Sequence, residues 1–130
     1  MKIANAGAGI GGLSAGLCLH EQGFEVRIFE AVETLQPLGV GSMMPHASGV
    51  LHGLGLDEMA IRTRAIAYCT RFGHLIQSDP RSVEAGFEFP RYSIHGGDLQ
   101  FLLLNTLRAR AGQVVVWFGL MAHTGRQLCK

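Results

Sequence analysis

Five glycines lie within the ten residues GAGIGGLSAG, from Gly7 to Gly16. Gly7, Gly9 and Gly12 form the pattern G-x-G-x-x-G. In this pattern the first glycine makes a tight turn, the second lets the backbone approach a pyrophosphate, and the third lets a helix pack closely. The N-terminus of that helix offers free N–H groups and a partial positive charge to phosphate oxygens. The stretch therefore predicts a dinucleotide site.

A carboxylate follows at the spacing that such a site requires. Glu30 lies 23 residues after Gly7, where it would accept hydrogen bonds from a ribose diol and repel a 2′-phosphate. This favours FAD or NAD over NADP, and a glutamate rather than an aspartate leans slightly toward FAD. The residues alone leave FAD and NAD open. A purely structural glycine-rich turn beside a surface glutamate is the remaining alternative.

Three predicted elements hold these groups. Residues 2–6 (KIANA) indicate a short buried strand, in which Asn5 is unusual because such strands are normally apolar throughout. Apolar residues at helical spacing predict a helix from Gly9 to Gln22, and VRIFE, at 26–30, predicts a second strand. Strand, helix and strand form one βαβ unit, so the predicted fold class is α/β, a three-layer Rossmann-like domain.

The rest of the chain combines one regular helix with shorter elements. The helix is predicted from Asp98, as its cap, to Ala111. Its apolar stripe consists of Leu99, Leu102, Leu103 and Leu107. The shorter predictions are a loop over 35–48, helices over 47–54 and 57–64, a hairpin of 65–72 and 74–78 around Gly73, an irregular connection over 79–92, and a strand over 114–117.

Composition narrows the function classes. The 130 residues suffice for about one domain, and a net charge of +1 without any run of Lys or Arg argues against a nucleic-acid partner. We expect a cytoplasmic chain without an export signal or membrane span, because glycines interrupt its apolar start and the later apolar stretches are short. No metal site is expected, because neither the six histidines nor the three cysteines have ligand spacing.

Three stretches of the sequence resemble the FAD-dependent aromatic-ring monooxygenases, the family of salicylate and hydroxybenzoate hydroxylases. Residues 1–31 resemble the N-terminus of that family, and LGVGSMMPHASGVLHGLGL, at 38–56, resembles its segment beside the flavin. PRSVEAGFEFPRYSIHGGDLQFLLL, at 80–104, resembles the branch that contains phenazine-carboxylate monooxygenase. The stretches follow one another in the family's order, and the likeness covers residues 2 to about 115.

The resemblance implies the FAD-binding N-terminal part of an enzyme that uses NAD(P)H and O2 to hydroxylate a small aromatic substrate. It assigns no catalytic side chain, because the cofactor carries the chemistry. It places Gly7, Gly9 and Gly12 at the pyrophosphate and Glu30 at the ribose. The other cofactor-binding residues that it implies are Ile10, Gly11 and Ala31, and Gly41 and His46 in the loop along the flavin.

The sequence also departs from the family. Gly96 stands where the family has an arginine that contacts FAD, and the flavin loop GSMMPHA, at 41–47, is one residue short. The family's downstream D-G and G-D motifs are missing, and residues 119–130 form a divergent tail. We therefore predict a partial FAD-binding domain over 1–118 that is incomplete at its C-terminal side. The alternatives are a non-catalytic truncated dinucleotide-binding fragment and an NAD-binding module of a dehydrogenase.

Overall fold

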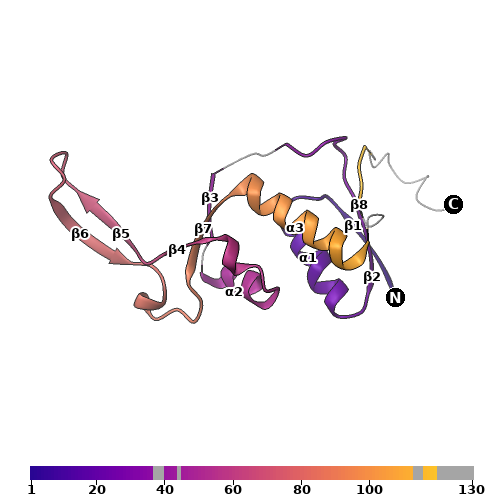
Figure 1. The fold of residues 1–130 in the computed structure, drawn as a ribbon, viewed down its shortest axis with the longest axis horizontal. Coiled ribbons are helices and arrows are strands. Elements are labelled where there is room, and N and C mark those ends of the chain that lie inside the picture. Colours follow the sequence, from indigo (N-terminus) through magenta and orange to yellow (C-terminus); the bar gives the residue numbers. More distant parts are fainter. Residues whose placement is uncertain (37–39, 44, 113–115, 120–130) are drawn as a thin grey trace. The chain divides into compact units, whose positions relative to one another are not determined.

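The computed structural model of the chain describes residues 1–36, 40–43, 45–112 and 116–119 (Figure 1). The chain divides into two compact units. The first unit is formed by Met1–Leu38 with Gly96–Lys130, and the second unit by Gly39–His95. The elements of the first unit alternate between strand and helix, and the predicted α/β class is confirmed. The division into a domain over 1–118 and a tail over 119–130 stays a prediction.

The first unit contains the predicted βαβ unit and extends it, but the strand over residues 2–6 is an edge strand whose residues are exposed or half-buried, so the prediction that it is buried was wrong. Its elements in chain order are β1 (Lys2–Ala6), α1 (Ile10–Glu21), β2 (Glu25–Phe29), α3 (Gly96–Ala111) and β8 (Val116–Trp117). The three strands form a parallel sheet with β2 in the middle. Of the strand predicted over 114–117, residues 116 and 117 are confirmed as β8, and the preceding two lie outside the described residues.

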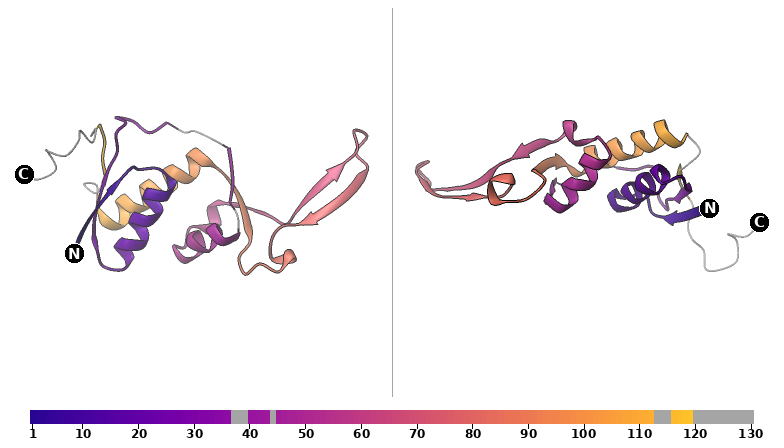
Figure 2. Two further views of the ribbon diagram at one scale, coloured as in Figure 1. Left: turned by 180° about the vertical axis from the view of Figure 1, so that it is seen from behind. Right: turned by 90° about the horizontal axis from the view of Figure 1, so that it is seen from below.

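The core of the first unit lies between α1, β2 and α3. Helices α1 and α3 run side by side (Figures 1 and 2), and Arg110 near the end of α3 pairs with Glu21 at the end of α1. A Cβ on Gly16 of α1 would lie 2.9 Å from the Ile28 side chain and 3.6 Å from that of Leu107. This small residue therefore lets the helix approach both neighbours. The largest fully buried apolar side chains of the unit are Leu13, Leu17, Ile28, Leu103 and Leu107, each worth about 1.5–3 kcal/mol of burial.

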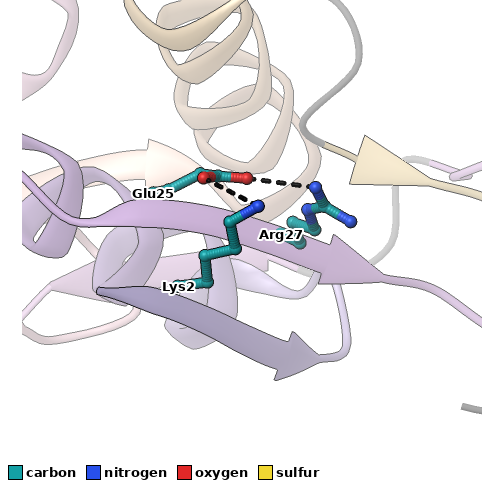
Figure 3. A network of polar contacts seen from close by, with 3 residues as sticks. All are labelled: Lys2, Glu25 and Arg27. Carbon is teal, nitrogen blue, oxygen red and sulfur yellow. Dashed lines mark hydrogen bonds and ion pairs between the residues drawn. The ribbon is translucent and has the colours of Figure 1, made fainter. Parts of the chain in front are cut away.

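The open face at the start of the sheet carries a small charged network (Figure 3). Lys2 and Glu25 stand opposite each other in the parallel register, with Nζ and Oε2 3.5 Å apart. Arg27 donates to the other carboxylate oxygen at 3.1 Å, which is the main cause of the lowered pKa of Glu25. All three side chains are about half exposed or more, so this network contributes little to stability.

The second unit is built around its last strand. β7 (Arg91–His95) lies between β3 (Val40–Met43) and β4 (Ile61–Thr63) and is antiparallel to both. The predicted hairpin is confirmed as β5 (Ala65–Cys69) and β6 (Leu75–Pro80), which form a separate two-stranded sheet. The remaining elements are α2 (Pro45–Gly53) and two single 3-10 turns, η1 (Asp57–Met59) and η2 (Val83–Ala85).

For several segments of the second unit, the predicted type of secondary structure was wrong. The loop expected over 35–48 contains β3 and the first turn of α2, and the helix expected over 57–64 is the single turn η1 followed by β4. Both misread strands are three or four residues long, too short to show a period, and their stability comes from pairing with β7. The irregular connection expected over 79–92 contains the end of β6, η2 and the start of β7.

Helix α3 begins earlier than expected. Its first residue is Gly96, so Asp98 lies within the first turn and does not precede the helix as a cap. Of the predicted stripe, Leu102 is half-buried, and Leu104 is buried in addition. Among the described helices, none has the length and apolar character of a membrane span. Within the same residues, no three His, Cys, Asp or Glu side chains gather as metal ligands would.

Candidate dinucleotide-binding site

The chain leaves β1 through a turn that requires glycine. Gly7 has a φ of +100°, a backbone conformation that residues with a Cβ rarely adopt. Its N–H donates to the Phe29 carbonyl at 2.7 Å, which continues the β1–β2 ladder by one step beyond the strands. The turn is thereby tied to the end of β2, where Glu30 follows.

The third glycine of the motif permits a very close approach. A Cβ on Gly12 would lie 2.1 Å from the Gly7 carbonyl oxygen and 2.8 Å from the Asn5 side-chain nitrogen. Because real Cβ atoms do not approach other heavy atoms so closely, α1 can start directly above the turn only with glycine at this position. The first turn of the helix is thereby fixed next to the end of β1.

The N-terminus of α1 suits an anion. Gly9 is its N-cap, no side chain caps it, and no acidic residue lies in the first turn. Gly9, Ile10 and Gly11 are exposed, and a Cβ on either glycine would meet no atom of the described chain within 4 Å. This space at a helix N-terminus fits the pyrophosphate of a dinucleotide, because N–H groups and the helix dipole point into it.

The carboxylate of Glu30 is fixed beside this turn. Its Oε2 accepts from the Ala8 N–H at 2.6 Å and its Oε1 from the Val32 N–H at 3.1 Å. Its backbone N–H donates to the Trp117 carbonyl of β8 at 2.8 Å. The hydrogen bonds from Ala8 and then Val32 lower the pKa of Glu30, so the group is ionised at neutral pH. Each oxygen retains an acceptor site for a ribose hydroxyl.

Two amide side chains support the turn, and sequence reasoning assigned neither of them. Asn5 Nδ2 donates to the Gly12 carbonyl at 3.1 Å and to the Gly7 carbonyl at 3.4 Å. Gln100 Nε2, from α3, donates to the Ala8 carbonyl at 2.9 Å. The polar Asn5 inside an apolar strand was the signal for the first contact. Gln100 carries no comparable signal, because 92 residues separate it from Ala8.

The structure brings only part of the predicted site together. The pyrophosphate residues Gly7, Gly9, Ile10, Gly11 and Gly12 and the carboxylate of Glu30 share one end of the first unit, and exposed Ala31 follows Glu30. Gly41 lies in β3 opposite Ile94, and His46 lies in α2 with its side chain outside the described residues. Both belong to the second unit, so their contact with a cofactor stays a prediction.

Comparisons with known proteins agree on one family. No established family profile matches the chain. It is 44% identical to phenazine 1,6-dicarboxylic acid hydroxylase PhzS of Lysobacter antibioticus, over 91% of this chain and 30% of that protein. It is 37% identical to 3-amino-4-hydroxybenzoate 2-monooxygenase of Streptomyces cremeus, over 85% of this chain and 30% of that protein.

A solved structure gives the same result for the fold. HpxO of Klebsiella pneumoniae, in complex with FAD and uric acid, superimposes with a TM-score of 0.73 at 25% identity, over 92% of this chain and 31% of HpxO. The chain thus spans about a third of the length of the relatives that it matches. These matches identify it as a homologue of the FAD-dependent aromatic hydroxylases, to which it corresponds over an N-terminal portion.

Proposed function

We propose that this chain provides the FAD-binding part of a monooxygenase that uses NAD(P)H and O2 to hydroxylate a small aromatic compound. The observation that carries the proposal is the open α1 N-terminus held beside the ionised Glu30 carboxylate. This pair offers N–H donors for a pyrophosphate and acceptors for a ribose diol. The homologues that share this segment act on phenazine dicarboxylate, aminohydroxybenzoate and urate, which are all small aromatic compounds.

The residues of this chain would bind and orient the cofactor. The N–H groups of Gly9 and of the first turn of α1, from Ile10 to Gly12, would hold the pyrophosphate, and Glu30 with Ala31 the adenosine ribose. Gly41 and His46 would lie along the flavin. FAD, when bound, supplies the redox chemistry that connects NAD(P)H, O2 and the aromatic ring. No side chain of the described chain is assigned a proton or electron transfer, so the role proposed here is binding and positioning.

The proposal is tested by titrating the purified chain with FAD while following flavin fluorescence, with FMN, NAD and ADP as competitors. We expect saturable FAD binding that ADP displaces and FMN does not, because the anchor is the adenosine end. Tighter binding of NAD than of FAD would instead indicate a dehydrogenase module. Absence of FAD binding at micromolar protein would contradict the proposal and leave the non-catalytic fragment as the interpretation.

A substitution at Glu30 tests whether its carboxylate contributes to FAD binding. Glu30→Gln removes the charge and one acceptor, so FAD should bind about tenfold more weakly, as for loss of a charged hydrogen bond. Glu33→Gln, at an exposed glutamate three residues later, is the matched control and should leave the affinity unchanged. Equal affinity of the wild type and Glu30→Gln would exclude a ribose contact.

The missing arginine offers a gain-of-function test. Gly96→Arg restores the cation that the resemblance places at this position. If the restored guanidinium reaches the flavin side, FAD should bind about tenfold more tightly while ADP binding stays constant. A parallel gain for ADP would show that the new charge acts on the phosphates, and no gain for either ligand would show that the chain has rearranged there.

A further inference from the structure

We propose that Gln100 is a positioning residue of this site: by holding the Ala8 carbonyl it aims the N–H of Gly9 at the bound pyrophosphate. The contact is a hydrogen bond of 2.9 Å from Nε2 of Gln100 to the Ala8 carbonyl oxygen. Gln100 lies in the first part of α3 between the buried Leu99 and the buried core residue Leu103. The amide is therefore carried by a packed helix and not by a mobile loop.

Because the peptide unit is planar, the contact to the Ala8 carbonyl also fixes the direction of the Gly9 N–H. The Ala8 carbonyl and the Gly9 N–H belong to one planar peptide unit, and in a trans peptide they point in opposite directions. The described chain has no cis peptide bond. Gln100 takes the carbonyl on the protein side, so the Gly9 N–H points away from α3. Within the described residues this N–H has no hydrogen-bond partner, and Gly9 is exposed.

The preceding peptide unit is held at both ends. Asn5 contacts the Gly7 carbonyl at 3.4 Å, and Glu30 accepts from the Ala8 N–H at 2.6 Å. Gln100 adds the third fixed point, without which the Ala8–Gly9 peptide could rotate, because glycine imposes little on its neighbouring torsions. A turn ordered before binding avoids the entropic cost of ordering it on binding. This role rests on the proposed function, since it presupposes a ligand with a pyrophosphate.

Gln100→Met tests the role, because methionine has nearly the same length and no N–H donor. We expect FAD and ADP to bind about fivefold more weakly, which is the effect of one lost hydrogen bond. The melting temperature without ligand should also fall by about 3–5 °C, because Ala8 is fully buried and its carbonyl loses its partner. Gln77→Met makes the same change at an exposed glutamine of β6 and is the control. Gln100→Lys keeps a donor and should restore most of the affinity.

A second readout separates positioning from general stability. In ¹⁵N-labelled protein, ADP should shift the Gly9 amide signal strongly in the wild type and in Gln77→Met. The shift should be much smaller in Gln100→Met. Equal affinity and an equal Gly9 shift in Gln100→Met would overturn the positioning role while the proposed function stands. Loss of ADP and FAD binding in the wild type itself would overturn both.

The wild type also carries a test of its own, should Gln100→Met fail to fold. If the hydrogen bond to Ala8 exists, the side-chain amide protons of Gln100 should exchange with solvent at least tenfold more slowly than those of exposed Gln77. Equal exchange rates for the two side chains would contradict the proposal.

Discussion

Polar side chains act in opposite ways at the glycine turn of the first unit and around Tyr92 in the second unit. In the first unit, side chains hold backbone atoms: Asn5, Glu30 and Gln100 bond to carbonyl and N–H groups of the glycine turn. The groups that remain free for a ligand are backbone N–H groups. In the sequence these positions are recognised by glycines, which have no side chain to cover the N–H groups. Substitutions that add atoms at these glycines should therefore disturb the site most.

Around Tyr92 in the second unit, side chains bond to one another. Tyr92 is fully buried in the central strand β7, and its hydroxyl donates to Asp57 Oδ2 at 2.9 Å. His52 Nδ1 lies 3.2 Å from the same oxygen, and Thr63 and Ser93 join their hydroxyls across β4 and β7 at 2.9 Å. Such a network is damaged most by removed atoms. We therefore expect the glycine turn to be sensitive to added atoms and the Tyr92 network to removed atoms, and stability measurements on variants test both.

The largest effect is expected where an atom is added to the first unit. Gly12→Ala places a Cβ 2.1 Å from the Gly7 carbonyl oxygen, and the backbone on both sides must move. We expect a loss of about 3 kcal/mol in the free energy of unfolding, at the upper end for an overpacked site. Gly11→Ala, one residue earlier in the same helix, meets no atom within 4 Å and should instead stabilise by about 0.5–1 kcal/mol. Urea unfolding of both variants checks the contrast, which fails if they behave alike.

An added atom at Gly9 should separate binding from stability. Gly9 has a φ of −69° and open space around it, so Gly9→Ala introduces no clash. The entropic gain of alanine offsets its weaker N-cap, and the melting temperature should stay within about 2 °C of the wild type. The new methyl group enters the space proposed for the pyrophosphate, so the Kd for FAD should rise about tenfold. Calorimetric titration beside a thermal melt measures both quantities. An unchanged Kd would remove the ligand as the reason for a glycine here.

A removed atom in the second unit should cost less. Tyr92→Phe deletes the buried hydroxyl that donates to Asp57 and should lower the free energy of unfolding by about 1 kcal/mol, the usual net value of one hydrogen bond. Tyr68→Phe, at the half-exposed tyrosine of β5, is the control and should change stability little. FAD affinity should be unaffected by either variant. If Tyr92→Phe is as stable as the wild type, the network does not support the unit.

The smallest effect is expected in acid, and it should occur in both units. Backbone hydrogen bonds from Ala8 and Val32 lower the pKa of Glu30, and hydrogen bonds from His52 and Tyr92 lower the pKa of Asp57. A carboxyl group whose pKa is lower in the folded state stabilises the protein above its unfolded pKa and loses that contribution as pH falls through the folded value. Melting temperature should therefore decline below about pH 4.5, the ordinary value for Glu30.

Neutral variants assign this decline to the two units. Glu30→Gln and Asp57→Asn should each flatten the decline of the melting temperature with falling pH. Glu33→Gln should keep the full pH dependence of the wild type. If all three variants decline as steeply as the wild type, other carboxyl groups account for the acid sensitivity.

The difference between the units also explains what sequence reasoning could predict. α1 and most of α3 were predicted because their apolar residues recur at helical spacing and a glycine follows each helix. β1 was predicted from a short apolar run and β2 from its β-branched and aromatic residues. β3 and β4 were missed because only pairing with β7 makes such short segments strands. Glu30 was found by its spacing from Gly7. Gln100 was not, because a single hydrogen bond between residues far apart in the chain leaves no local pattern.

The distance along the chain between Ala8 and Gln100 also has a consequence for biosynthesis. The glycine turn is among the first residues to be made, yet the amide that supports it is 92 residues away. At about 5–20 residues per second, the ribosome needs several seconds or more to cover that distance. Closing so long a loop also costs entropy that the later contacts must offset. A nascent chain that has not yet exposed α3 therefore has the motif without its support, and cofactor capture becomes a late event in folding.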